Sequence, residues 1–143
     1  MYHYTESGLN NVWLTNGFEV RKVDGEDAVA IRDLKGLHKA IGKGIARKPH
    51  LTGAELRFLR KEMGLSQRRL GELLGVSEET ISLWERRGRM PKGYDRLVRV
   101  LYLECLNENV KLLQMIERLI DLDRKDPEKT VFEDTASGWK MAA

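Results

Sequence analysis

The segment from Gln67 to Glu85 constrains the fold more than any other part of the chain, because apolar and small residues recur in it at helical spacing. Its predicted core positions are Leu70, Gly71, Leu74, Gly75, Val76, Ile81 and Trp84. The two leucines would face inward from one short helix, and Ile81 and Trp84 from the next. Gly71 would let the helices approach closely, and Gly75 would take the positive φ of the turn. The segment therefore predicts two short helices that cross steeply.

Capping residues support this interpretation. Ser66 is expected to cap a helix from Gln67 to Leu74, and Ser77 one from Glu78 to about Arg87. A preceding helix is indicated by Thr52 and Glu55, which stand three residues apart as in a capping box, and Gly64 would end it.

Further helices are expected after Pro91. The apolar spacing predicts one helix from Tyr94 to Leu106 and another from Val110 to Leu122, with a break at residues 107–109.

The N-terminal part has a different pattern. Alternating residues from Asn11 to Asp33, interrupted by Asp24-Gly25, predict a β-hairpin. Apolar residues at helical spacing from Leu34 predict a helix after the hairpin. This helix should be short, because Gly42 and Gly44 interrupt the spacing. We therefore expect an N-terminal hairpin and helix extension over 1–50, a central domain over 51–104, a C-terminal helix over 105–123 and a flexible tail over 124–143. Trp139 in that tail either anchors a partner or belongs to an unstructured end.

The composition limits the kinds of site. The chain has 143 residues, 41% of them hydrophobic, with one cysteine (Cys105) and three scattered histidines (His3, His38 and His50). We therefore expect no disulfide, no metal site and no cofactor. The start of the chain lacks a basic and apolar leader, which predicts a cytoplasmic protein without a membrane segment.

Charge is distributed unevenly along the chain. Residues 32–51 carry a net charge of +5 and residues 52–100 a net charge of +4, whereas residues 1–31 and 101–143 each carry −3. A basic middle between acidic ends is typical of a module that faces phosphates, although a solvated surface of uneven charge would look the same.

The central motif resembles a known family. Leu65-Ser66-Gln67, Leu73-Leu74-Gly75-Val76-Ser77 and Thr80-Ile81-Ser82-Leu83-Trp84-Glu85 are similar to the Cro/cI-type (XRE) helix-turn-helix family, over about Thr52 to Leu103. The resemblance implies a mainly α, lambda-repressor-like bundle, here with a small α+β extension. It also implies a homodimeric transcriptional regulator, a repressor by expectation, that reads double-stranded operator DNA with helix 78–87 in the major groove.

The resemblance also implies which residues contact DNA. The expected base-reading residues are Glu78, Glu79, Thr80, Ser82 and Leu83. The expected phosphate-binding residues are Gln67, Arg68, Arg69, Arg86, Arg87, Arg89 and Lys92. Glu78 and Glu79 are unusual at a surface that faces DNA, because a carboxylate repels phosphate. Either Glu79 accepts a hydrogen bond from cytosine N4, or both acids favour the positive end of the helix dipole.

The C-terminal helices carry an apolar stripe of Leu101, Leu106, Val110, Leu113, Ile116, Leu119 and Ile120. It predicts a dimer interface, with intramolecular core as the alternative.

Gly8-Leu9, Val12-Trp13-Leu14, Gly17, Leu37-His38 and the run from Leu51 to Arg60 are similar to MqsA-type antitoxins. Those proteins often carry two CxxC pairs in a zinc-binding N-terminal domain, and these cysteines are missing here. The alternative function is therefore an antitoxin that binds a toxin through its N-terminal region and autoregulates its operon. A module that binds only a protein partner is a further alternative. We find no nucleophile with a base, no phosphate-cradling loop and no metal set, so we expect no enzymatic activity.

Overall fold

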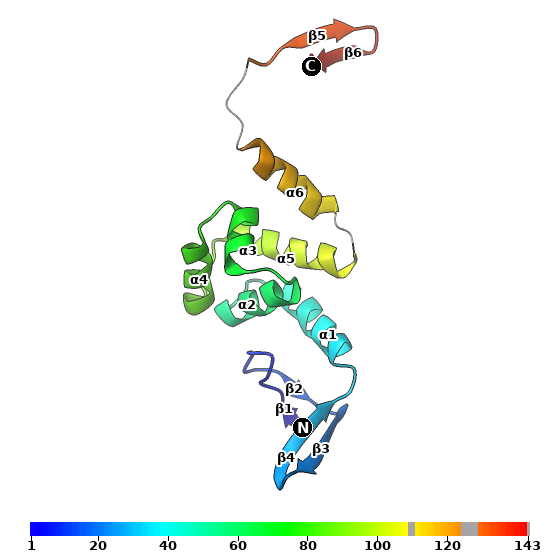
Figure 1. The fold of residues 1–143 in the computed structure, drawn as a ribbon, viewed down its shortest axis with the longest axis vertical. Helices are drawn as coiled ribbons and strands as arrows, with labels where there is room; N and C mark the ends of the chain where they lie inside the picture. The colour runs from blue at the N-terminus through cyan, green and yellow to red at the C-terminus, as the bar shows by residue number, and fades with distance from the viewer. Residues whose placement is uncertain (109–110, 124–128, 143) are drawn as a thin grey trace.

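The computed structural model describes residues 1–108, 111–123 and 129–142. Short strands lie at the N-terminal end of the molecule, a helical body lies in the middle, and the last helix and a second hairpin lie at the other end (Figure 1). The body contains α1 (Leu34–Ala46), α2 (Gly53–Glu62), α3 (Gln67–Leu74), α4 (Glu78–Arg87) and α5 (Lys92–Leu106), and α6 (Lys111–Leu122) follows. The mainly α class expected from the sequence is confirmed.

One hydrophobic core joins the helices of the body. Leu56, Leu59, Leu70, Ile81, Val98 and Leu101 are its most deeply buried large side chains. Ile45 and Ala46 at the end of α1 and Leu9 of the N-terminal segment belong to the same cluster. The core therefore extends beyond 51–104 into the segment expected to be an extension.

The predicted capping box at the start of α2 is present. The Thr52 hydroxyl accepts a hydrogen bond from the Glu55 N–H, and the Glu55 carboxylate accepts one from the Thr52 N–H at 2.9 Å. Burial by itself raises the pKa of Glu55, but the hydrogen bonds from Lys48 and Thr52 outweigh it, so the pKa is lowered. Glu55 therefore stays ionised and fixes the entry of α2.

A buried carboxylate anchors the loop between α1 and α2 on α5. Asp95 accepts hydrogen bonds from the Leu51 N–H at 2.8 Å and from Arg99 Nε at 2.7 Å. The Arg99 guanidinium also donates to the Lys48 carbonyl at 2.6 Å. Each of these polar groups has a partner, so the buried charges hold the loop in one position.

The predicted N-terminal hairpin is confirmed. Strands β3 (Phe18–Val23) and β4 (Glu26–Ile31) pair antiparallel across Asp24 and Gly25, which both have positive φ. The segment before the hairpin, which the sequence assigns to the same β region from Asn11 to Asp33, does not pair with it. Its strand β2 (Trp13–Leu14) pairs instead with β1 (Tyr2–His3). A strand of two residues is too short to show an alternating pattern, so β1 could not be predicted.

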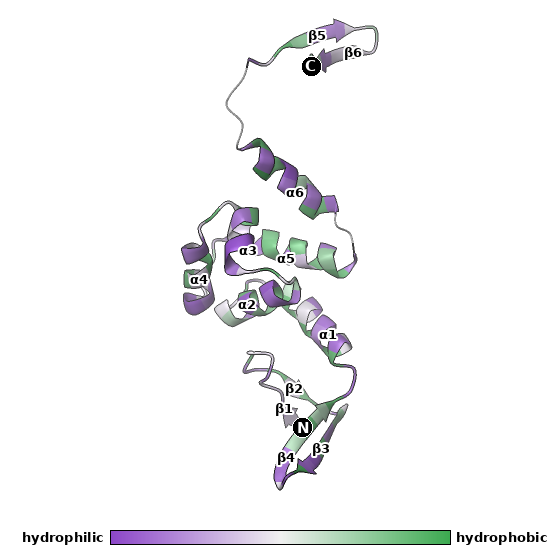
Figure 2. Ribbon diagram, in the orientation of Figure 1, coloured by the Kyte–Doolittle hydropathy of each residue, from purple (hydrophilic) through white to green (hydrophobic). Residues whose placement is uncertain are grey.

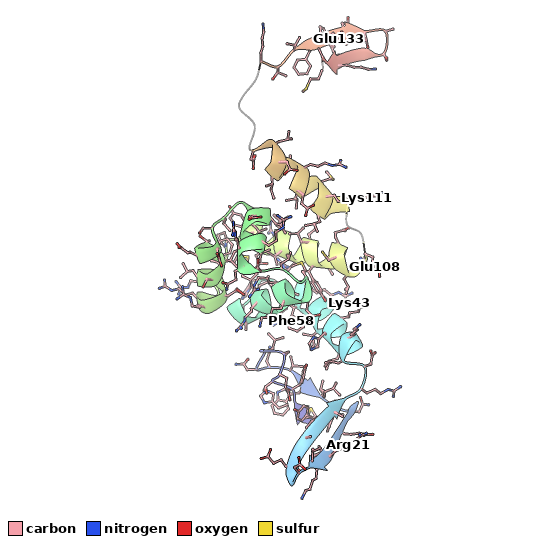
Figure 3. All side chains as sticks on the ribbon, viewed as in Figure 1. Arg21, Lys43, Phe58, Glu108, Lys111 and Glu133 are labelled. Carbon is pink, nitrogen blue, oxygen red and sulfur yellow. The ribbon has the colours of Figure 1, made fainter. Side chains whose placement is uncertain are left out.

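A polar chain attaches the N-terminal segment to the body. The Tyr4 hydroxyl lies 2.8 Å from His38 Nε2, and His38 Nδ1 lies 2.7 Å from a Glu62 carboxylate oxygen. The His38 ring also contacts the ring of Phe58, which is labelled on α2 in Figure 3. These contacts connect the β1 segment to α1 and α2.

Two expectations about secondary structure were wrong. Helix α1 runs through Gly42 and Gly44 to Ala46 instead of ending early, because Gly42 is buried against Tyr102 of α5 and tertiary packing outweighs the low helix propensity of glycine. Within the tail expected over 124–143, residues 132–141 form a hairpin of β5 (Phe132–Thr135) and β6 (Gly138–Met141), whereas residues 124–128 and 143 lie outside the described residues. The charged composition that suggested disorder ends near Lys129, and alternating apolar residues follow it.

Candidate nucleic-acid interface

The turn between α3 and α4 has the geometry that the sequence predicts. Gly75 ends α3 with φ 75°, and the Ser77 hydroxyl accepts a hydrogen bond from the Thr80 N–H to begin α4. A Cβ atom at Gly71 would lie 2.6 Å from the Val76 carbonyl oxygen. No side chain fits there without moving the backbone of the turn. The close crossing of α3 and α4 therefore depends on glycine at position 71.

The apolar residues predicted as the motif core lie in the hydrophobic core or against it. Leu70, Leu74, Ile81 and Trp84 are buried in the shared core, and Val76 packs against it. This inward face fixes the rotation of α4 about its axis, so the opposite face is presented to solvent (Figure 1).

A buried ion pair joins α4 to the two helices before it. Glu85 accepts a hydrogen bond from Arg60 Nε at 2.9 Å and another from the Gln67 amide at 2.8 Å. Arg60 also donates to the Leu65 carbonyl, in the turn between α2 and α3. The side chains of Glu85 and Arg60 are only 5% and 10% exposed. The network therefore holds α4 in a fixed position relative to α2 and α3.

The expected base-reading residues lie on the first two turns of α4. Glu78 and Glu79 are exposed in its first turn, whereas Thr80, Ser82 and Leu83 are partly buried. The Thr80 hydroxyl lies 2.8 Å from the Ser77 hydroxyl. The structure thus brings all five to one helix, and the two acids are the most exposed of them.

The expected phosphate-binding residues fall into two groups. Arg86, Arg87, Arg89 and Lys92 are exposed around the end of α4 and the start of α5, and Arg68 is exposed on α3. Of this exposed group, Arg68 lies 3.6 Å from a Glu72 carboxylate oxygen and Arg86 donates to the Ser82 carbonyl at 3.4 Å. Gln67 and Arg69 are partly buried and each bonds a carboxylate. The Gln67 amide donates to Glu85, and Arg69 pairs with Glu72 and with Glu117 of α6. The hydrogen bond to Glu72, followed by that to Glu117, raises the pKa of Arg69.

Sequence analysis missed two basic residues near this surface. A cavity of about 530 Å³ lies between the α1–α2 loop and the start of α5, and His50, Lys92 and Arg96 are among its lining residues. Arg96 follows Lys92 by four residues, so helical spacing alone could have placed both on one face. His50 could not be found this way, because tertiary packing brings its loop there.

The residues of the apolar stripe expected to form a dimer interface differ in how deeply they are buried. Leu101 is buried in the core, which makes its assignment to an interface wrong. Leu106, Leu113, Ile116 and Ile120 are partly buried, and Leu119 is exposed. Val110 lies outside the described residues.

Comparison with protein families tests the central motif. Residues 56–94 match the model of the helix-turn-helix family. This match covers most of α2, all of α3 and α4, and the start of α5, so it includes every predicted contact residue, and the family is one of DNA-binding regulators. No curated protein and no solved structure matches the chain. The similarity to MqsA-type antitoxins receives no support from these comparisons.

Among residues 1–108, 111–123 and 129–142, none of the helices is both long and apolar enough to cross a bilayer.

Proposed function

We propose that the chain is a sequence-specific transcriptional regulator, a repressor, that binds operator DNA as a homodimer with α4 in the major groove. The observation that carries this proposal is the fixed position of α4. Its inner face is buried through Ile81 and Trp84, and Glu85 bonds it to α2 and α3. Side chains on its outer face are therefore held in place before DNA arrives.

Specificity would come from the first turns of α4. The Glu79 carboxylate can accept a hydrogen bond from cytosine N4, and Ser82 lies three residues further along the helix and can donate to an acceptor on a base edge. Both acids also lie at the positive end of the α4 dipole, where a carboxylate stabilises the helix by about 0.3–1 kcal/mol. The two roles are compatible, because a dipole contact leaves the carboxylate oxygens accessible.

Affinity would come from the basic residues around the end of α4. Arg86, Arg87 and Arg89 follow the base-reading turns, and Lys92 begins the next helix. Basic side chains in this arrangement neutralise phosphates on both sides of the groove and release counterions. Gln67 would reach a phosphate only after leaving Glu85, so its contribution is smaller than the motif position suggests.

Salt dependence of DNA binding tests this assignment. Arg86→Ala and Arg87→Ala are each expected to weaken binding to every duplex alike and to reduce the slope of log K against log salt by about 1, because each removes one phosphate contact. Binding of the full chain to a selected duplex is measured by fluorescence anisotropy over a salt series. Arg21→Ala serves as control, since Arg21 lies on β3, away from α4 (Figure 3), and should leave the slope unchanged. Slopes identical to the native value in both variants of α4 would contradict the assignment.

A second candidate function is that of an antitoxin which also binds its own operator. Trp13, Val20 and Val23 are exposed apolar side chains of the N-terminal strands, and Val20 and Val23 lie on opposite faces of β3, so both faces of that strand offer apolar surface to a protein partner. This function would use α4 in the same way and add a toxin on the N-terminal strands.

A further inference from the structure

Helix α6 has one face on the body of the protein and an exposed apolar stripe beside that face. Leu112 and Ile116 pack against the core cluster, and Glu117 forms its ion pair with Arg69 of α3 at 2.6 Å. Met115, Leu119 and Leu122 are 58%, 61% and 55% exposed. Figure 2 shows hydrophobic and hydrophilic residues alternating around this helix. We call Met115, Leu119 and Leu122 the α6 stripe.

The spacing of the α6 stripe matches one heptad of a coiled-coil seam. Its residues are separated by four and then three positions, as at successive d, a and d positions of a heptad. A seam of this kind is narrow and suits one partner helix of similar shape. The partner that always carries a matching stripe is a second copy of the same chain.

Opposite charges border the two sides of the α6 stripe. Arg118 occupies the g position on one side, and Asp123 occupies the e position on the other. Asp123 continues the helical register, since its N–H donates to the Leu119 carbonyl at 3.1 Å. Within the part of the chain that the structure describes, neither side chain has an ion-pair partner.

The charge pattern selects the orientation of the partner helix. In a parallel pair, the g position of one helix faces the e position five residues further along the other, so Arg118 faces Asp123 of the second copy. In an antiparallel pair, g faces g, and Arg118 would meet basic residues instead. We therefore propose that two copies of this chain associate through a parallel, two-fold symmetric α6 seam formed by Met115, Leu119 and Leu122 and bordered by Arg118–Asp123 ion pairs.

This seam deepens the proposed function, because it names the surface on which the dimeric DNA binding of that function rests. Each α6 is held on its own body by Glu117 and the contacts with α3 and α5. The helix is therefore ordered before association, and a short seam is not opposed by the cost of forming the helix. The two-fold axis would lie along the α6 pair and place one α4 on each side of it.

Sedimentation equilibrium of the full chain without DNA tests the seam. The native chain should show a monomer–dimer equilibrium, and Leu119→Glu should raise the dimer dissociation constant at least about tenfold, because it places a charge in the seam. The matched control is Val20→Glu, at an equally exposed apolar residue (59%) of β3, which should change it less than about twofold. Far-UV circular dichroism checks that each variant is folded.

Charge exchange tests the orientation. Arg118→Asp alone and Asp123→Arg alone should each weaken the dimer by about threefold to tenfold, and the double variant should regain the native constant within about twofold. A monomeric native chain, a dimer that Leu119→Glu leaves intact, or a dimer strengthened by Arg118→Asp alone would overturn the proposal. Because no DNA is present, these results are independent of whether the protein binds DNA.

Discussion

Replacing Glu85 by alanine is expected to lower the free energy of unfolding by about 3–5 kcal/mol, because it leaves the buried Arg60 guanidinium without its counter-charge. The carboxylate is bonded to Arg60 and to the Gln67 amide, and both Arg60 and Glu85 are shielded from solvent. A domain of this size is stable by only about 5–15 kcal/mol, so the loss would approach the whole stability of a weakly stable chain. Urea unfolding followed by circular dichroism gives the value from the shift in the midpoint at constant slope.

The matched control for this variant is Glu79→Ala on the same helix. Glu79 is exposed in the first turn of α4, so its removal should cost no more than about 1 kcal/mol of dipole stabilisation. A loss below about 1 kcal/mol for Glu85→Ala, similar to that of the control, would show that the ion pair does not hold α4 in place.

Gly53→Ala should destabilise the protein by about 1–3 kcal/mol, although alanine normally stabilises a helix relative to glycine. A Cβ atom at this position would overlap the Glu85 carbonyl oxygen and crowd the Trp84 carbonyl at 2.9 Å. Both are backbone atoms near the end of α4, so relief requires a shift of α4 away from α2. Thermal unfolding of the variant measures the effect, and a weaker affinity for DNA should accompany it because α4 moves.

Gly44→Ala is the control for this substitution. Gly44 lies inside α1 without a positive φ, and among the described residues no neighbouring heavy atom lies within 4 Å of the place that an alanine methyl would take. Alanine should therefore stabilise the protein there by about 0.5–1 kcal/mol through helix propensity. Opposite signs for the two variants support the close approach of α2 and α4, whereas stabilisation by both would refute it.

Local signals in the sequence were sufficient to predict the helix-turn-helix itself. Ser66, Ser77 and the Thr52–Glu55 pair each make the capping bonds expected of them, because a cap involves only neighbouring residues. Gly71 was predicted correctly for a similar reason, since the turn it contacts lies a few residues away. The Asp24-Gly25 hairpin also depends on nearby residues alone.

The features that sequence analysis missed depend on contacts between distant parts of the chain. Nothing near Gln67 indicates that its amide is bonded to Glu85, or that Arg69 faces Glu117 of α6. Leu101 belongs to a stripe that predicts either a dimer surface or core, because an apolar pattern does not reveal which part of it the body covers. The hairpin at 132–141 was missed because the charged residues before it dominated the composition of the tail.

Selection of bound duplexes from a random pool, followed by sequencing, is the most direct test of α4 as the reading helix. It is carried out with the native chain, Glu79→Ala and Ser82→Ala, and with Arg87→Ala as a variant expected to lose affinity without changing preference. The proposed function predicts that Glu79→Ala or Ser82→Ala changes the preference at particular base positions by about 1–3 kcal/mol. Base preferences in both variants that are the same as those of the native chain would contradict it.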